Sequence, residues 1–522
     1  MRRIGNCSGL PRPPRKSGAT SCAGTKRAGS PCNGRRDSRR QYAAAASAIY
    51  PRSENTEESE LKISFHGADR DVTGSCHLVE CAGKRILIDC GLYQGSRELD
   101  QENAGPFGFD AASIDYVLLT HAHLDHCGRL PLLAKRGFRG EIITTSASRE
   151  LARLVMLDAA HLLEEDARHR ARRGGHGGAN GDTTASFYST LDALNCLDNF
   201  GRTATYAQAL DVTAGVKATF IDAGHILGSA SIFLQLAEES HSTSVLFSGD
   251  LGNTGRVLLR SPATPPRADN VVMETTYGDR LHKSLGPSID ELFEAITETF
   301  KRGGNVIIPT FALERAQELL YFLKQGISTG RLAESTQVFL DSPMAISATE
   351  IFRRHPECFE PATAKLFQGS HDPFDLPGLH FTRESAESVA LNSIRGGAII
   401  MAGSGMCTGG RVRHHLQHNL DRDNSAIVFV GYAAAGTLAR RIIDGAKQVR
   451  IFGEEIAVRA RIYTINGFSA HADQAELLAW QSQTGAKRTF LVHGEQDSMT
   501  KFAAHLGDTH VEMPMQNQSF EL

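Results

Sequence analysis

The stretch THAHLDHCGRLP constrains this chain more than any other, because it places three histidines and an aspartate within six residues. It follows the apolar run DYVLL, which predicts a buried strand ending at His121. Alternation past the strand end lets His121 and His123 face one ion. Asp125 and His126, at the start of a helix, turn toward a second ion. Imidazole and carboxylate ligands are typical of a catalytic zinc site with an open coordination position.

Other apolar runs also end in residues that bind metals. KRILID ends at Asp89, TSVLFSGD ends at Asp250, and KRTFLVHGE leads to His493, while AGHILGSAS adds His225 in a glycine turn. Because sites in layered α/β folds are assembled at strand ends, we predict that His225, Asp250 and His493 complete two coordination shells, with Asp250 bridging two metals that clamp a phosphate and activate water. Asp89 is expected to orient a ligand or the attacking water. Taken alone, each of these residues is more often structural.

The first segment of the chain differs in composition from the rest. Residues 1–53 hold twelve Lys or Arg and one acidic residue, a net charge of +11, whereas the whole chain carries −3. The segment is rich in Arg, Ser, Gly and Pro and has no apolar periodicity, so residues 1–61 are predicted to be a disordered basic extension. A transit peptide, a nucleic-acid-binding tail and a misassigned start are the alternatives.

The sequence lacks the features of a membrane-spanning protein and of a disulfide-rich or cysteine-zinc protein. No run of about 18 apolar residues occurs, which predicts that no segment spans a membrane. The ten cysteines include no CxxC pair, so neither a disulfide framework nor a cysteine zinc knuckle is indicated. A reducing, cytoplasmic environment fits this cysteine usage best.

The region after residue 287 reads as alternating helices and strands. SIDELFEAITETFKRGG has Ser288 and Glu291 at capping-box spacing, followed by apolar residues at helical spacing. NVIIPT then reads as a buried strand, ALERAQELLYFLKQG as a helix and TQVFLD as a strand. This alternation predicts a parallel sheet. Residues 174–186, GGHGGANGDTTAS, read as an exposed loop.

A glycine-rich loop in the same region predicts a phosphate site. AIIMAGSGMCTGGRVRHHL reads as a strand, a loop and a helix. Backbone N–H groups at such a helix start can hold a phosphate, and Ser404, Gly405 and Arg411 are the candidate contacts. A tight turn that requires glycine dihedral angles is the alternative.

Several of these motifs together resemble a known family. ILIDCG, THAHLDHCGRLP, AGHILGSAS and FSGDLG, in this order, resemble the metallo-β-lactamase motifs, and ETTYGDR, GFSAHAD and LVHGE match the three extra motifs of the β-CASP branch. DSPMA, GSGMCTGGR and GYAAAGTLARR also resemble β-CASP segments. The resemblance covers about residues 62–522 without a departure at any motif. It implies an α/β fold: a metallo-β-lactamase αββα sandwich of residues 62–278 and 462–522, interrupted by a parallel α/β β-CASP domain of residues 279–461.

The resemblance also implies a function. The branch includes RNase J and the 3′-end-processing endonuclease of the cleavage and polyadenylation machinery, and the compact layout is most similar to the bacterial RNA-processing ribonucleases. It assigns His471 to phosphate binding or leaving-group protonation, with Glu274 beside it to hold the imidazole protonated. His493 stands where RNA enzymes of the branch carry histidine and DNA cross-link repair nucleases carry valine.

The sequence therefore predicts a zinc-dependent ribonuclease with two Zn²⁺ per chain that hydrolyses single-stranded RNA and can form the homodimer common in its family. A DNA nuclease, a small-molecule hydrolase and a non-catalytic RNA-binding scaffold are the alternatives; the inserted domain argues against a small substrate and the complete ligand set against a scaffold. The resemblance makes Ser404, Gly405 and Arg411 contacts to the RNA backbone. The catalytic candidates are Asp89, Asp125, Glu274 and His471. The predicted metal ligands are His121, His123, Asp125, His126, His225, Asp250 and His493.

Overall fold

The computed structural model describes residues 61–522 except 96–101, 174–185, 368–371, 432 and 434–435. The predicted basic extension and the predicted loop at residues 174–186 therefore lie almost entirely outside the described residues. No helix in the described part of the chain is long and apolar enough to cross a membrane.

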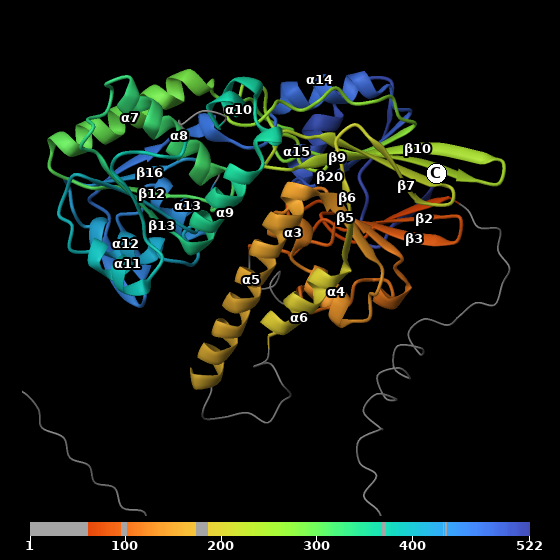
Figure 1. Cartoon of the computed structure of the whole chain (residues 1–522), viewed down its shortest axis with the longest axis horizontal. Helices are drawn as coiled ribbons and strands as arrows, with labels where there is room; N and C mark the ends of the chain where they lie inside the picture. The colour runs from red at the N-terminus through yellow and green to blue at the C-terminus, as the bar shows by residue number, and fades with distance from the viewer. Residues whose placement is uncertain (1–60, 96–101, 174–185, 368–371, 432, 434–435) are drawn as a thin grey trace, which may run out of the picture. The chain divides into compact units, whose positions relative to one another are not determined.

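Two seven-stranded sheets pack face to face (Figure 1). Between them lies a core of fully buried side chains, with Val79 and Ile88 from one sheet and Phe220, Ile232 and Phe490 from the other. The first sheet has the order β22 (Ser519–Glu521), β1 (Lys62–Phe65), β2 (His77–Cys81), β3 (Lys84–Ile88), β4 (Tyr116–Leu118), β5 (Glu141–Thr145) and β6 (Phe200–Ala204). The second has the order β21 (His510–Glu512), β20 (Arg488–Val492), β11 (Asn270–Glu274), β10 (His241–Phe247), β9 (Ala230–Glu238), β8 (Val216–Asp222) and β7 (Ala209–Thr213).

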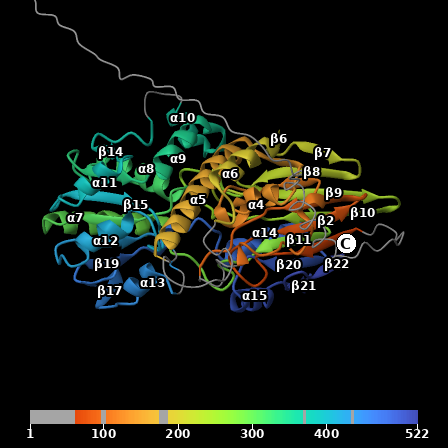
Figure 2. The same cartoon turned by 90° about the horizontal axis from the view of Figure 1, so that it is seen from below.

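Helices cover the outer faces of both sheets. Buried leucines of α4 (Leu130–Lys135) and α5 (Ser146–Arg173) pack with Leu87 and Val117 of the first sheet, and α6 (Thr190–Cys196) lies beside these two helices (Figure 2). On the second sheet, α14 (Gln474–Thr484) and α15 (Gln496–Ala503) pack against Leu246 and Leu491. The αββα sandwich that the sequence resemblance implied is confirmed.

A third sheet of six strands is built from the segment between β11 and β20, and each of its strands runs parallel to its neighbours. This confirms the predicted parallel sheet, and β12, β13 and β15 coincide with NVIIPT, TQVFLD and AIIMAG. Its order is β14 (Leu379–Phe381), β13 (Gln337–Asp341), β15 (Ala398–Ala402), β12 (Val306–Pro309), β16 (Ala426–Phe429) and β19 (Arg461–Thr464). Its helices are α7 (Leu285–Lys301), α8 (Arg315–Ser328), α9 (Pro343–Arg354), α10 (Pro361–Phe367), α11 (Ser385–Leu391), α12 (Val412–Asn419) and α13 (Leu438–Ile443).

The remaining described elements are short. The short helix α3 (Leu124–Cys127) carries part of the THAHLDH motif, and a two-stranded hairpin joins β17 (Gln448–Ile451) to β18 (Glu454–Ala457). The single-turn helices are η1 (Ala111–Ser113), η2 (Leu197–Asn199), η3 (Pro356–Cys358) and η4 (Asn466–Phe468).

The predicted capping box at Ser288 and Glu291 is wrong, because α7 begins at Leu285 with Ser284 as its N-cap. Pro287 does not stop the helix, since a proline in the first turn removes an N–H group that has no helical partner there. Ser288 is therefore buried inside the helix, and its hydroxyl donates to the Ser284 carbonyl at 3.2 Å.

Gly91 sets how closely the end of β3 approaches the loop that carries Asp125. A Cβ at Gly91 would lie 1.6 Å from the Asp125 carbonyl oxygen and 2.7 Å from the His126 nitrogen. Gly91→Ala is therefore expected to displace this loop, to cost about 1–3 kcal/mol of stability and to lower the content of bound zinc. Thermal unfolding and metal analysis of the purified protein would measure both effects.

Gly286→Ala is the matched control, because nothing lies within 4 Å of a Cβ at that position in α7. Equal metal content and equal melting temperature in the two variants would contradict the role assigned to Gly91.

Candidate metal centre and active site

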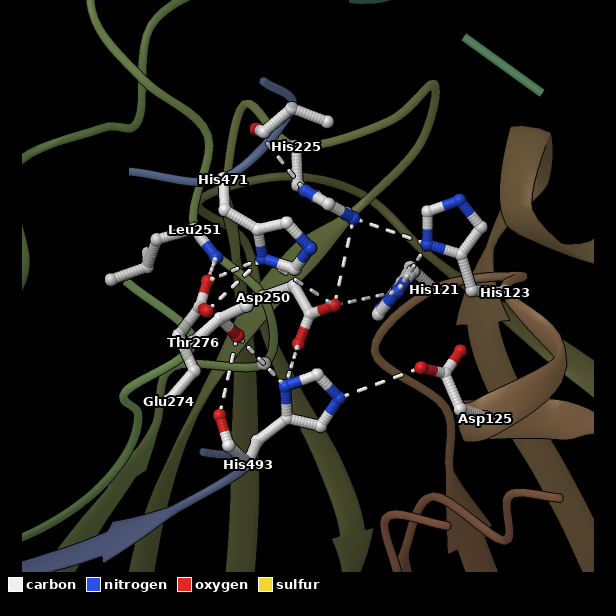
Figure 3. Close-up of polar contacts among 12 residues, drawn as sticks. His121, His123, Asp125, His225, Asp250, Leu251, Glu274, Thr276, His471 and His493 are labelled. Atoms are coloured by element: carbon white, nitrogen blue, oxygen red, sulfur yellow. Dashed lines mark hydrogen bonds and ion pairs between the residues drawn. The ribbon is translucent and has the colours of Figure 1, made fainter. Parts of the chain in front are cut away.

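Four ligand-type side chains converge as a first group (Figure 3): His121, His123, His225 and Asp250. The Nδ1 atom of His123 lies 3.2 Å from His121 Nε2 and 3.1 Å from His225 Nε2. The Oδ2 atom of Asp250 lies 3.5 Å from each of these Nε2 atoms. Ligands at 2.0–2.1 Å from a tetrahedral zinc ion are separated by about 3.3 Å. The four atoms therefore have the spacing of one zinc coordination shell.

A second group holds Asp125, His126 and His493. Asp250 also reaches this group, because its other oxygen, Oδ1, lies 3.2 Å from His126 Nε2 and 3.6 Å from His493 Nδ1. His493 Nε2 lies 3.5 Å from Asp125 Oδ2. One carboxylate thus presents one oxygen to each group, which is the arrangement of a bridging ligand. All seven side chains that the sequence predicted as metal ligands are brought together.

The donor atoms of these groups fit a bound metal. His126 Nε2, His493 Nε2 and Asp250 Oδ1 are buried and have no hydrogen-bond partner in the described part of the chain. Unpaired buried polar atoms are costly, so such a concentration of them indicates a missing ligand. Burial lowers the pKa of His123 to about 4 and holds that of His121 well below its usual value, which keeps both imidazoles neutral, as metal ligands must be.

A layer of hydrogen bonds behind the two groups orients the imidazoles. Asp89 accepts from the backbone N–H and the hydroxyl of Thr120, both at 2.7 Å, and from His126 Nδ1 at 2.7 Å. This contact keeps the Nδ1 proton on His126 and turns Nε2 toward the centre. The Nδ1 atom of His225 lies 3.3 Å from the Ala470 carbonyl and is oriented in the same way. Thr120 was not foreseen, although its position directly before His121 was a signal.

Glu274 and His471 form a pair at the edge of the first group (Figure 3). Glu274 is fully buried and accepts from the Leu251 backbone N–H at 2.6 Å and from His471 Nδ1 at 3.0 Å. Burial lowers the pKa of His471, but the Glu274 carboxylate outweighs it, and the pKa rises to about 9. His471 Nδ1 also lies 4.0 Å from Asp250 Oδ2. The pair therefore places a protonated imidazole next to the bridging carboxylate.

The glycine-rich loop lies at the carboxyl end of β15, away from these groups in sequence. The Ser404 hydroxyl accepts from the Gly409 backbone N–H at 3.3 Å. The Arg411 guanidinium donates to Asp341 Oδ1 at 2.7 Å and to two backbone carbonyls. Most of its donors are thus used within the protein, and contacts of Ser404, Gly405 and Arg411 to RNA remain predictions.

A buried charge cluster, defined as Arg256, Glu314, Arg315 and Glu318, was missed by the sequence reasoning. Arg256 donates to the backbone carbonyl of His225 at 2.8 Å, and its Nη2 atom lies 3.3 Å from Glu314 and 3.4 Å from Glu318. Each of the four residues is at most 6% exposed. The cluster joins the loop of His225, a predicted metal ligand, to the start of α8. No motif signalled it, because its partners are far apart in the sequence.

Comparisons with known proteins now decide the family. Models of three families match the chain: the metallo-beta-lactamase superfamily over residues 69–310, the Beta-Casp domain over 316–442, and the Zn-dependent metallo-hydrolase RNA specificity domain over 455–514. Ribonuclease TTHA0252 of Thermus thermophilus is 39% identical over 439 residues, which cover 84% of this chain and 94% of the relative. The chain belongs to the β-CASP family of the metallo-β-lactamase superfamily.

More distant relatives agree with this membership. Transcription termination factor FttA of Methanocaldococcus jannaschii is 30% identical over 454 residues, covering 85% of this chain and 68% of the relative. An RNase J-like protein of the same organism is 29% identical over 455 residues, covering 86% and 96%. The predicted family is therefore confirmed, and the β-CASP chain is a metal-dependent hydrolase.

Asp250→Ala in this β-CASP protein is expected to lower the bound zinc by at least one ion per chain, because one oxygen of Asp250 faces each group. Metal analysis by mass spectrometry, after dialysis, would measure the loss. Asp269→Ala is the matched control, since this half-buried carboxylate pairs with Ser244 and Lys487 outside the centre. Full metal content in Asp250→Ala would contradict the bridging role.

The charge cluster predicts a pH dependence of stability. Burial raises the pKa of Glu314 from 4.5 to about 7, although Arg256 opposes the rise. A carboxyl with a higher pKa in the folded state takes up a proton on folding, so its contribution to stability falls as the pH rises from about 4.5 to about 7. Glu314→Gln stays neutral and should lose this term. The difference in melting temperature, Glu314→Gln minus wild type, is therefore expected to increase between about pH 5 and about pH 8.

Glu298→Gln in α7 is the control for this comparison, because the Glu298 carboxylate pairs with Lys301 at the surface, outside the cluster. Parallel pH curves for Glu314→Gln and the wild type would show that Glu314 is charged in the folded protein throughout this range.

Proposed function

We propose that this protein is a zinc-dependent ribonuclease that hydrolyses phosphodiester bonds of single-stranded RNA with two zinc ions per chain. The observation that carries the proposal is Asp250, whose two oxygens lie between two groups of histidine and aspartate side chains. The match to an RNA specificity domain and the similarity to a named ribonuclease support RNA as the substrate. The names of the other relatives support a role in RNA processing or termination.

Zinc held by the seven ligands supplies a Lewis acid for the scissile phosphate and lowers the pKa of water at the site. The protein's own groups do the rest. Asp89 fixes the tautomer of His126, and Asp125 with His493 completes the second group. Glu274 holds the proton on His471 Nδ1, so that the other ring nitrogen can donate a proton to the departing oxygen or bind the phosphate.

Several finer assignments are part of the same proposal. We place the domain boundaries at residues 62–278, 279–461 and 462–522, although the first strand after residue 460, β19, pairs with β16 of the six-stranded sheet. The seven cysteines of the described chain are buried and free, which supports a reducing, cytoplasmic environment. Homodimerisation is carried over from the family resemblance alone.

Cleavage assays would test the proposed function. The zinc-loaded full chain is expected to cleave end-labelled single-stranded RNA and to leave the matching DNA intact. His471→Gln should keep bound zinc but lower kcat by about 10²- to 10⁴-fold, the usual contribution of general acid catalysis. The product ladder would distinguish attack from an end from attack within the strand.

Asp269→Ala serves again as the control that should cleave like the wild type. Cleavage of DNA alone would favour a repair nuclease instead. Binding of RNA without cleavage by the zinc-loaded wild type would favour an RNA-binding scaffold.

A further inference from the structure

Phe311 is an exposed aromatic residue in a stretch that is otherwise buried. It lies two residues after the end of β12, and its side chain is 43% exposed, whereas Thr310 is 1%, Ala312 7% and Leu313 5% exposed. The backbone thus turns a single large ring outward at the carboxyl end of a central strand. Leaving such a ring in water gives up hydrophobic stabilisation, so its exposure calls for an explanation.

The glycine-rich loop positions this ring. A Cβ at Gly405 would lie 2.8 Å from Cε2 and 2.9 Å from Cδ2 of Phe311, so one edge of the ring rests on the bare Gly405 backbone. Phe452, the second exposed phenylalanine of the described chain, is different, because it stacks on the His414 ring at 4.4 Å and carries the Arg413 guanidinium at 4.5 Å. No ring or cation of the described residues stacks on Phe311 in this way.

The place of Phe311 in the fold connects the two ends of the candidate site. Pro309 of β12 pairs with Ala402 of β15, so the segments that follow these strands leave the same edge of the sheet. Three residues beyond Phe311, Glu314 contacts Arg256, which in turn bonds to the His225 carbonyl. A chain spans at most about 3.6 Å per residue, so Phe311 and Glu314 are within about 11 Å of each other. Phe311 thus touches the glycine-rich loop and lies three residues before the residue that is linked, through Arg256, to the His225 loop.

We propose that Phe311 is a stacking platform for one base of the RNA strand whose scissile phosphate lies at the metal centre; this rests on the proposed function. A nucleobase fits a single exposed ring held by its edge, because it needs one π-face and no wide apolar patch. An apolar peptide would need a broader hydrophobic surface than one side chain provides. Every base has a π-face, so the contact adds affinity without a sequence preference.

Binding measurements with the full zinc-loaded chain would test the proposal. The probes are an end-labelled single-stranded RNA and a series in which one nucleotide at a time is abasic. Phe311→Ala and Phe311→Leu are expected to weaken binding of the intact RNA by about 5- to 100-fold, the usual effect of losing one base stack, and to raise KM more than they lower kcat. Phe311→Trp should retain affinity and show fluorescence quenching on RNA binding, against a background of the single buried Trp480.

The abasic series distinguishes stacking from packing. At one position of the strand, the difference between the wild type and Phe311→Ala should disappear, because the base that stacks is missing. Phe452→Ala, with a phenylalanine of similar exposure lost elsewhere, is the matched control and should bind RNA like the wild type.

Each other outcome is informative. Intact RNA bound equally by the wild type and Phe311→Ala would overturn the stacking platform while leaving the ribonuclease proposal in place. An equal loss with every abasic RNA, or rescue by leucine, would make Phe311 a packing residue and overturn it as well. A wild type that neither binds nor cleaves RNA would overturn the proposed function, and the stacking role with it.

Discussion

The structure of the site depends on how neighbouring histidines stabilise the negative charge of the buried carboxylate Asp250. Asp250 is 2% exposed, and burial alone would favour its neutral form. The neighbouring His493 and His126 outweigh burial and hold the pKa of Asp250 well below its ordinary range. Because an isolated buried charge is very unfavourable, the chain must bring these imidazoles to the same place. The ends of β10 and β20 and the short helix α3 bring these side chains together.

The inserted segment is tied to this balance by a second set of buried charges. Two arginines and two glutamates pair with one another where the start of α8 meets the loop of His225. Breaking one partner of such a set leaves an uncompensated buried charge, which typically costs about 3–5 kcal/mol. The cluster thus specifies how α8 docks on the loop. It also connects helix α8 of the β-CASP domain to the backbone of His225, a predicted metal ligand.

The sequence predicted the parts of this structure that are determined by short, continuous stretches of residues. The HxHxDH motif, the strands that end in Asp89 and Asp250, and the alternation that gives the parallel sheet could all be read from periodicity and spacing. Family resemblance supplied the order of the layers. The start of α7 differs from the prediction, because Ser288 and Glu291 have capping-box spacing but the helix begins earlier and accommodates Pro287 in its first turn. Arg256 and Phe311 had no local signal, since their roles come from contacts between distant segments.

One consequence of the strand order concerns how the protein is made. The strand that leads to His493, β20, lies inside the second sheet between β11 and β21, and β22 pairs with the first described strand, β1. On a ribosome all six strands of the β-CASP sheet are synthesised before either sandwich sheet has all its strands. The six-stranded sheet can therefore form early, while both sandwich sheets still lack strands. Residues 488–521 supply the strands that complete both sheets, so a nascent chain that ends before β20 carries six of the seven predicted metal ligands but no finished site.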